Sequence, residues 1–367
     1  MSVLAAIAVL AILIVVHELG HFMAARLQGI YANRFSIGFG PILWKYQGPE
    51  TEYALRAFPL GGFVGFPDDD PEMNGIDPKD PNLLQNRPLI DRAIVISAGV
   101  IANLIFAYLL LVLQVGIFGT QEFSALPGVR VPEVKSELSS VAAKAGIQAG
   151  DVILAIDGKE LGASSQSTEI LMKEIQASPN QPLEFTIQRN GEVLPQPIVV
   201  TPEVTPTDGK VRIGVGLAPN GVIKKERLSN PLAILAKAAD DFQRITVLIL
   251  KGFGQLITNF GQVADQISGP VRIVDEGAKL ARSDATGLFT FGALISINLA
   301  IINILPLPAL DGGHLAFLLI EGLRGKPLPS KIRDGVMQTG LMLILGLGIF
   351  LIVRDTTQLE SIQKLFR

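Results

Sequence analysis

The sequence predicts an α-helical integral membrane protein that is interrupted by a soluble α/β domain. Of its 367 residues, 49% are hydrophobic and only 18% are charged, which is too apolar for an ordinary soluble enzyme. Four apolar runs approach the ~20 residues that a helix needs to cross a bilayer. A long polar stretch, from about residue 119 to 283, separates the second run from the third. We therefore expect a lipid bilayer as the surroundings of two membrane halves, with a soluble insert between them.

The four predicted transmembrane helices cover about residues 2–25, 93–118, 288–305 and 336–353. The first run is apolar from Ser2 to Val16 and resumes after His17-Glu18. A cleaved signal peptide is the alternative interpretation, but it would carry basic residues before its apolar core, and Met1-Ser2-Val3 offers none.

Residues 231–257 are only partly apolar. Their centre is surrounded by charged side chains, namely Asp240, Asp241, Arg244 and Lys251. This pattern predicts an amphipathic helix on the membrane surface and no fifth span. A fifth span would place the segments on either side of it on opposite faces of the membrane.

Basic residues in short loops indicate the orientation of the chain. They cluster between spans one and two, and between spans three and four: Arg26, Arg34, Lys45, Arg56, Arg87, Arg92, Arg324, Lys326, Lys331 and Arg333. We expect these two loops to be cytoplasmic in a multi-pass protein of the cell membrane. The insert and both termini then lie outside the cytoplasm.

The composition of the chain also excludes several kinds of partner, metal ligand and catalytic residue. The net charge of -3 and the lack of a basic run interleaved with aromatics argue against a nucleic-acid partner. The chain has no cysteine, so disulfides, thiolate metal ligands and cysteine nucleophiles are excluded. Any metal must be held by carboxylates and by the three histidines, His17, His21 and His314.

A metal-binding pattern lies in the first span. His17-Glu18-Leu19-Gly20-His21 has the H-E-x-x-H spacing, which places two imidazoles one turn apart on one face of a helix. A carboxylate at Glu18 would take a proton from the water that attacks a peptide carbonyl and return it to the leaving amine. Ionisable groups within a span are costly unless they are paired or bind something, so this cluster predicts a functional site.

A catalytic zinc needs a third protein ligand and an open position. Asp311 is the candidate, in the segment Asn303-Ile-Leu-Pro-Leu-Pro-Ala-Leu-Asp-Gly-Gly-His314. Pro306, Pro308 and the Gly312-Gly313 pair should break the helix at membrane depth, where irregular backbone is tolerated if it lines a cavity or is buried in protein. Imidazole and carboxylate ligands with an open position favour Zn²⁺ as the cofactor.

The first half of the insert reads as strand, short helix, glycine turn and strand. The stretch AAKAGIQAGDVILAIDGKEL resembles the PDZ domain pattern, and the match covers about residues 123–203. PDZ domains take an extended peptide by adding it to a sheet edge, so a peptide ligand is expected. A domain that only gates access, or packs on the membrane, is the alternative.

Several motifs together resemble the site-2 protease family of intramembrane metalloproteases, in its bacterial form. They are HELGH in the first span, NILPLPALDGGH after the third, PLGGFVGF in the first loop and the inserted PDZ domain. The resemblance implies His17, His21 and Asp311 as zinc ligands, Glu18 as general base and Asn303 as a substrate contact. It implies single-span membrane proteins as substrates, such as anti-sigma factors already shortened by another protease, or signal-peptide remnants.

The resemblance also implies a membrane-associated β-hairpin at about residues 34–66. Its paired Gly61 and Gly62 would let the hairpin edge hold substrate as a strand, and a plain hairpin buried against the spans is the alternative. In the second span, Gly99 and Asn103 resemble the family's Gly-x-x-x-Asn. Helix packing explains Gly99 equally well, and Asn103 is either a polar partner of the site or an interhelical hydrogen bond.

The expected domains are thus a first membrane half at 1–119, a PDZ domain at 120–205, an amphipathic linker at 206–283 and a second membrane half at 284–367. Two other functions remain open. A catalytically silent PDZ protein that binds membrane proteins is weakened by the intact Glu18. A metal transporter is weakened because neither motif is repeated along the chain.

Overall fold

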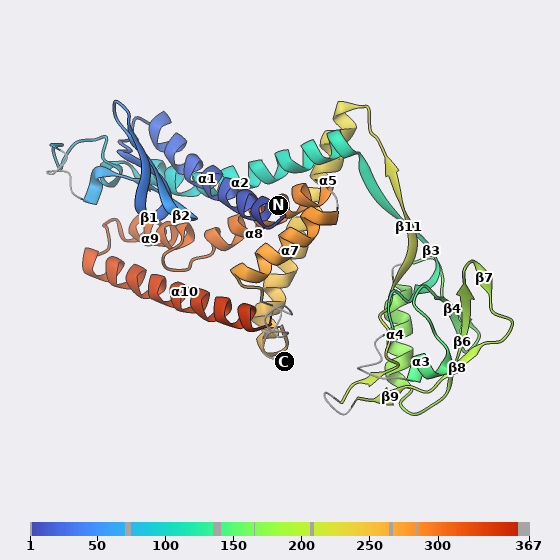
Figure 1. Cartoon of the computed structure of the whole chain (residues 1–367). Coiled ribbons are helices and arrows are strands. Elements are labelled where there is room, and N and C mark those ends of the chain that lie inside the picture. The colour runs from blue at the N-terminus through green and yellow to red at the C-terminus, as the bar shows by residue number, and fades with distance from the viewer. Residues whose placement is uncertain are drawn as a thin grey trace. The chain divides into compact units, whose positions relative to one another are not determined.

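The computed structural model describes residues 2–69, 75–134, 141–164, 166–205, 209–263, 267–283 and 285–358. The chain divides into two compact units, whose elements are labelled in Figure 1. Residues 1–118 and 228–367 form the membrane unit, and residues 119–227 form the inserted unit.

Four helices of the described chain are long and apolar enough to cross a membrane, which confirms the predicted number. They are α1 (Ser2–Leu27), α2 (Leu89–Phe118), α8 (Ala285–Ile304) and α10 (Ser330–Gln358). The membrane unit also contains η1 (Pro67–Asp69), η2 (Leu84–Asn86), α5 (Pro231–Thr258), α6 (Phe260–Val263), α7 (Pro270–Ser283) and α9 (Asp311–Arg324).

Helices α1 and α2 approach each other closely because small residues meet at their crossing. A Cβ added to Gly20 would lie 2.5 Å from the carbonyl oxygen of Ala98 and 2.7 Å from Cβ of Ala102. Small residues are the usual means by which helices pack tightly in membranes. Since Gly20 lies between the two histidines of α1, this contact presses the H-E-x-x-H segment against α2.

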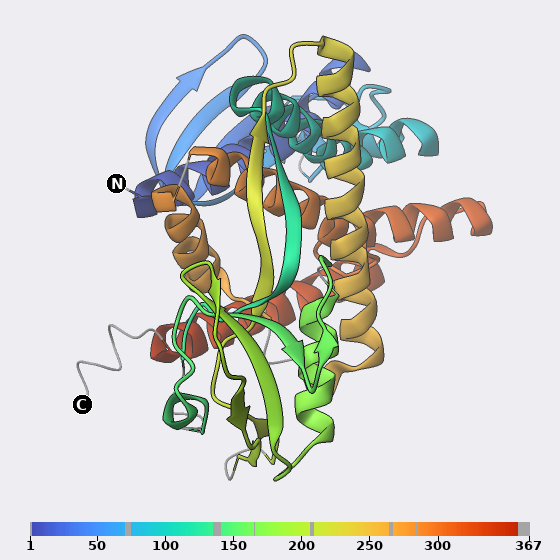
Figure 2. The ribbon, with the colours of Figure 1, turned by 90° about the vertical axis from the view of Figure 1, so that its right-hand side faces the viewer.

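Helix α5 covers the region that the sequence predicted as an amphipathic helix, and Figure 2 shows it as one long helix. Its N-cap is Asn230, whose side chain accepts a hydrogen bond from the backbone N–H of Leu232. Ala238 and Ile245 are buried with residues of α2 and α8, and the Tyr108 hydroxyl donates to the carbonyl of Leu235. Helix α5 is not among the candidate spans of the described chain.

Strands β1 (Arg34–Gln47) and β2 (Glu52–Gly65) follow α1. The two strands do not form a simple hairpin, because the start of β1 pairs with two different segments of β2. Near the turn Tyr46 pairs with Tyr53, whereas Arg34 pairs with both Glu52 and Gly65. The start of β1 therefore lies between two segments of β2, and residues 62–65 stand beside it on one edge.

The helix break after α8 differs in one respect from the prediction. Residues 305–310, including both prolines, are non-helical, and Ala309 has a φ of 70°. Gly312 and Gly313 do not break the helix but lie in its first turn, because α9 begins at Asp311. A Cβ on either glycine would overlap backbone carbonyls of the preceding segment, so their role is to let α9 start against the end of α8.

The inserted unit is a sheet with short helices. The sheet has the order β11-β3-β4-β6-β7, with β5 on β4 and β8 on β6, and β9 pairs separately with β10. Its strands are β3 (Thr120–Arg130), β4 (Val152–Ile156), β5 (Lys159–Glu160), β6 (Leu183–Arg189), β7 (Glu192–Val193), β8 (Ile198–Val200), β9 (Glu203–Val204), β10 (Val211–Arg212) and β11 (Ala218–Glu226). Its helices are α3 (Val141–Ala145) and α4 (Ser167–Ala177), and Phe185, Ile187 and Leu171 lie at the centre of its apolar core.

Candidate metal centre and active site

Three side chains from α1 and α9 converge in the membrane unit. His17 and His21 are one turn apart on α1, and their Nε2 atoms are 3.3 Å from each other. Oδ2 of Asp311, the first residue of α9, lies 3.3 Å from Nε2 of His17 and 3.4 Å from Nε2 of His21. The break after α8 therefore brings a carboxylate to two imidazoles almost 300 positions away in the chain.

The donor atoms fit a zinc ion. Oδ2 of Asp311 is buried and receives no aligned hydrogen bond from the described residues, although two ring nitrogens stand close to it. The three ligand atoms lie within 4.8 Å of one another, close enough to bind one metal ion. Two histidine nitrogens and one carboxylate oxygen are also a donor set that catalytic zinc accepts, with further positions open.

Helix α2 supports both histidines from behind. Nδ1 of His21 donates to the backbone carbonyl of Val95 at 2.8 Å, which leaves Nε2 of that ring as the metal-facing nitrogen. Gly99 lies directly against the two rings, because a Cβ there would overlap the ring of His21 and lie 2.8 Å from Cε1 of His17. The side chain of Asn103, which is fully buried, lies 3.2 Å from Nδ1 of His17.

Glu18 projects beside the histidines toward β2. A Cβ added to Gly62 would lie 2.8 Å from Cγ of Glu18, and the Glu18 carboxylate accepts a hydrogen bond from the backbone N–H of Val64. The edge formed by residues 62–65 thus runs next to this carboxylate. Glu18 is placed by two elements, α1 and β2.

Asn303 also reaches the metal-facing side of the site. It is buried near the end of α8, and its amide nitrogen lies 3.3 Å from Nε2 of His17. Gly61, by contrast, is turned away from the three converging side chains, since its missing side chain faces the ring of Phe39. His314 is exposed and is not part of the three-residue cluster.

The sequence did not reveal every contributor to the site. Val95 acts through a backbone carbonyl, and a backbone contact leaves no trace in residue type. The position of Gly62 against Glu18 depends on the fold of β2. These two contacts could be found only from the packing of α1 against α2 and against β2.

Comparisons with known proteins identify the family of the chain. The model of Peptidase family M50 matches residues 5–347. A Nostoc protein named "Putative zinc metalloprotease all3971" is 62% identical over 371 residues, covering 100% of both chains. The "Membrane metalloprotease ARASP, chloroplastic" of Arabidopsis thaliana is 49% identical, over 99% of this chain and 80% of that protein.

A more distant relative is the "Regulator of sigma-E protease RseP" of Salmonella typhimurium, which is 29% identical over 93% of this chain and 96% of its own length. The chain belongs to peptidase family M50, the site-2 proteases. It is a multi-pass membrane metalloprotease, and its metal is zinc.

Proposed function

We propose that this protein hydrolyses peptide bonds within or beside the transmembrane segment of single-span membrane proteins. In this proposal His17, His21 and Asp311 hold the zinc and Glu18 is the general base. The observation that carries the proposal is the convergence of these residues inside a bundle of helices long and apolar enough to span a membrane. A buried polar cluster at such depth is otherwise costly.

Zinc, when bound, supplies Lewis-acid chemistry that activates water and polarises a carbonyl. Glu18 then accepts the proton of the attacking water at a carboxylate oxygen and delivers it to the nitrogen of the leaving amine. The N–H of Val64 holds this carboxylate in place while the proton moves. The amide of Asn303 lies on the metal-facing side of His17, where it can donate to the substrate carbonyl as negative charge develops there.

The edge of β2 offers a way to present the substrate backbone. A peptide bond inside a helix is hydrogen-bonded and shielded, so it must be extended before it is attacked. An extended peptide laid along residues 62–65 would pass beside Glu18, because Gly62 brings this edge to within contact of the Glu18 side chain. Exposed apolar residues of β1 and β2, such as Trp44 and Phe58, support a strand pair that enters the membrane.

The expected substrates are regulators such as anti-sigma factors, or remnants of signal peptides. The family resemblance supports this class, and one relative is named as a regulator of sigma-E. The distribution of basic residues supports a cytoplasmic side for both loops that flank the metal site, and the opposite side for the inserted unit and both termini. We propose the cell membrane as the location, although one relative is named as chloroplastic.

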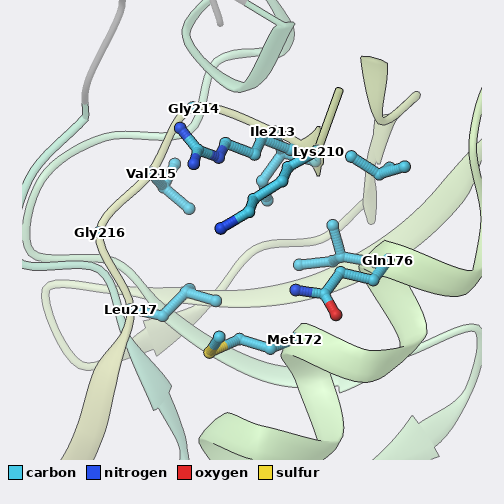
Figure 3. A pocket seen from close by; sticks show the side chains of 11 residues that line it. Met172, Gln176, Lys210, Ile213, Gly214, Val215, Gly216 and Leu217 are labelled. Carbon is cyan, nitrogen blue, oxygen red and sulfur yellow. The ribbon is translucent and has the colours of Figure 1, made fainter. Parts of the chain in front are cut away.

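We further propose that the inserted unit is a PDZ domain that takes an extended peptide. Figure 3 shows a pocket of about 370 Å³ between α4, which contributes Met172 and Gln176, and the strand-like segment 210–217. One edge of that segment is already paired, since Val215 forms a bridge with Val134 and the N–H of Gly216 donates to Glu133. The other edge faces α4 and is suited to strand addition.

The groove can be tested with two substitutions on the same helix. Met172 lines the pocket and is 44% exposed, so Met172→Glu should change how fast an intact membrane substrate is cut without unfolding the domain. Lys173→Glu, which does not line the pocket, is the control. If deletion of the domain derepresses cleavage of full-length substrates while Met172→Glu has no effect, the domain is a gate and not a peptide receptor.

The proposed active site is tested by cleavage of a model single-span substrate in liposomes by the purified full-length protein. Asp311→Asn and a zinc chelator should each abolish cleavage, and Asp311→Asn should also lower the bound zinc measured by atomic absorption. Full zinc content and full activity in Asp311→Asn would refute its role as a ligand.

A further inference from the structure

One face of α2 lines the back of both histidines. Val95, Gly99 and Asn103 are spaced four residues apart, so they share a face of the helix. Nδ1 of His21 contacts the backbone carbonyl of Val95, and both rings lie against Gly99. Nδ1 of His17 contacts the side chain of Asn103. His21 thus has a backbone carbonyl as its partner, whereas His17 has a side-chain amide.

The hydrogen bonds at His17 impose a choice of tautomer. A neutral imidazole has one N–H and one acceptor nitrogen. If Nε2 of His17 is a metal ligand, the proton must reside on Nδ1, and Nδ1 then needs an acceptor. The amide nitrogen of Asn103, which lies 3.2 Å from Nδ1, can only donate.

The side chain of Asn103 also carries the acceptor that Nδ1–H of His17 needs. Oδ1 of Asn103 is buried and has no hydrogen-bond partner among the described residues, and Asn103 is 0% exposed. The two ends of an amide have nearly the same shape, so a half-turn about the Cβ–Cγ bond exchanges them. That half-turn brings Oδ1 to Nδ1 of His17 and satisfies both atoms together.

We infer that Asn103 is a positioning residue that selects the zinc-binding tautomer of His17. In this arrangement Oδ1 of Asn103 accepts from Nδ1–H of His17, and the lone pair of Nε2 faces the zinc. The opposite amide orientation donates to Nδ1, moves the ring proton to Nε2 and blocks coordination. The inference rests on the proposed role of His17 as a ligand.

The packing around Asn103 supports this assignment. The hydroxyl of Ser296, which is fully buried in α8, donates to the backbone carbonyl of Asn103 at 2.8 Å. The backbone of α2 is therefore fixed at the position from which the amide reaches His17. An ordinary interhelical hydrogen bond looks different, as at Gln114 of α2, whose Oε1 accepts from the hydroxyl of Thr290 on α8.

The test measures zinc affinity in the purified full-length protein by competition with a fluorescent chelator. Asn103→Asp keeps an oxygen acceptor and should retain zinc affinity near that of the wild type. Asn103→Leu keeps the branched shape of the side chain but has no acceptor, and its affinity should fall about 10- to 100-fold, the usual cost of losing such a partner of a ligand. Gln114→Leu removes a polar side chain of the same helix that does not touch His17, and should bind zinc normally.

A second readout reports the tautomer directly. The chain has only three histidines, so ¹⁵N-histidine NMR of the zinc-loaded protein, with His314→Gln to remove the third ring, reports on the two proposed ligands His17 and His21. We expect a protonated Nδ1 and a metal-bound Nε2 in the wild type and in Asn103→Asp. In Asn103→Leu with zinc at saturating concentration, the Nδ1–H signal of His17 should shift and exchange faster with solvent.

The outcomes separate this inference from the proposed function. Zinc binding that survives His17→Leu would refute the proposed ligand set. Zinc binding that is lost in His17→Leu but unchanged in Asn103→Leu would leave the ligand set intact and overturn the role of Asn103. Equal losses in Asn103→Asp and Asn103→Leu would also overturn it, because the acceptor oxygen would not be what matters.

Discussion

Each of the two units of this protein contains an aspartate with a buried carboxylate oxygen, and the surroundings of the two carboxylates are opposite. In the inserted unit, Asp151 has a side chain that is 1% exposed, and Arg189 donates to both of its carboxylate oxygens at 2.8 Å. The backbone N–H of Gln148 adds a third hydrogen bond. In the membrane unit, the buried Oδ2 of Asp311 has no aligned partner among the described residues and faces two histidine nitrogens.

The difference separates a carboxylate that stabilises the fold from one that is available to bind a metal. A buried charge that is fully paired contributes to a single well-defined fold, whereas an unpaired one costs free energy unless a ligand compensates it. In the membrane unit, this free-energy cost arises at Asp311, where α1, α2 and α9 meet. The contrast predicts that changes near Asp311 affect metal binding, and that changes near Asp151 affect stability alone.

The largest effect on metal binding is expected for Gly99→Ala. The added methyl would overlap the ring of His21 and press on His17, so both rings must move. Zinc affinity should fall by at least about 100-fold, and cleavage should fall with it. The measurement is chelator competition in detergent, with Gly116→Ala as the control. Gly116 lies on the same helix, and its nearest neighbour is 4.0 Å from the added Cβ.

Gly62→Ala should separate catalysis from metal binding. Its methyl would lie 2.8 Å from Cγ of Glu18 and 2.9 Å from the carbonyl oxygen of Ser36, so Glu18 or the strand must shift. Misplacing a catalytic group by about 1 Å can cost roughly 100-fold in rate. We expect cleavage to fall by about 10- to 100-fold with zinc content unchanged. Cleavage at the level of Gly335→Ala, which adds a methyl in open space on α10, would refute the proximity of β2 to the base.

Asp151→Asn should leave both zinc affinity and cleavage chemistry intact but loosen the inserted unit. Removing the charge leaves Arg189 without its ionic partner, at a cost of about 2 to 3 kcal/mol. Hydrogen exchange of the β4 and β6 amides in the full-length protein should accelerate accordingly. Lys159→Gln, which breaks a surface ion pair with Glu174, should have little effect.

The same pair gives a pH dependence with a defined sign. Burial alone would raise the pKa of Asp151, but hydrogen bonds from Arg189 and Gln148, together with the charge of Arg189, hold that pKa below its ordinary value. The stabilisation is therefore complete above the unfolded-state pKa of about 3.9 and is lost as the pH falls below it. The exchange difference between wild type and Asp151→Asn should narrow below that pH. A difference that widens on acidification would contradict the pairing.

The sequence was most informative where function constrains residue type at a fixed spacing. His17 and His21 are adjacent on a helix by periodicity alone, and Asp311 stood out because prolines interrupt an apolar run beside it. The start of α9 at Asp311 was not predictable in this way, since Gly312 and Gly313 signal a helix break equally well. Both glycines are helical, and a residue with a side chain would not fit at either position, because its Cβ would overlap the carbonyl oxygen of Leu305 or Leu307.

Contacts made by the backbone or by long-range register were also beyond the sequence. The carbonyl of Val95, the placement of Gly62 and the double pairing of Arg34 depend on how α1, α2 and β2 are packed. The residues around the Asp151–Arg189 ion pair and around the metal ligands are of ordinary types, so amino-acid composition does not mark either place. The relative positions of residues within one helix could be predicted from the sequence, whereas the contacts between different helices and strands could be seen only in the structure.

In the proposed mechanism, Glu18 performs proton transfer at a metal that other residues hold. The most direct test is Glu18→Gln, with zinc content and cleavage of a single-span substrate in liposomes measured on the same preparation. We predict a full complement of zinc and a loss of cleavage of about 100- to 10,000-fold, the usual contribution of a general base. Cleavage at the wild-type rate with zinc bound would contradict the mechanism.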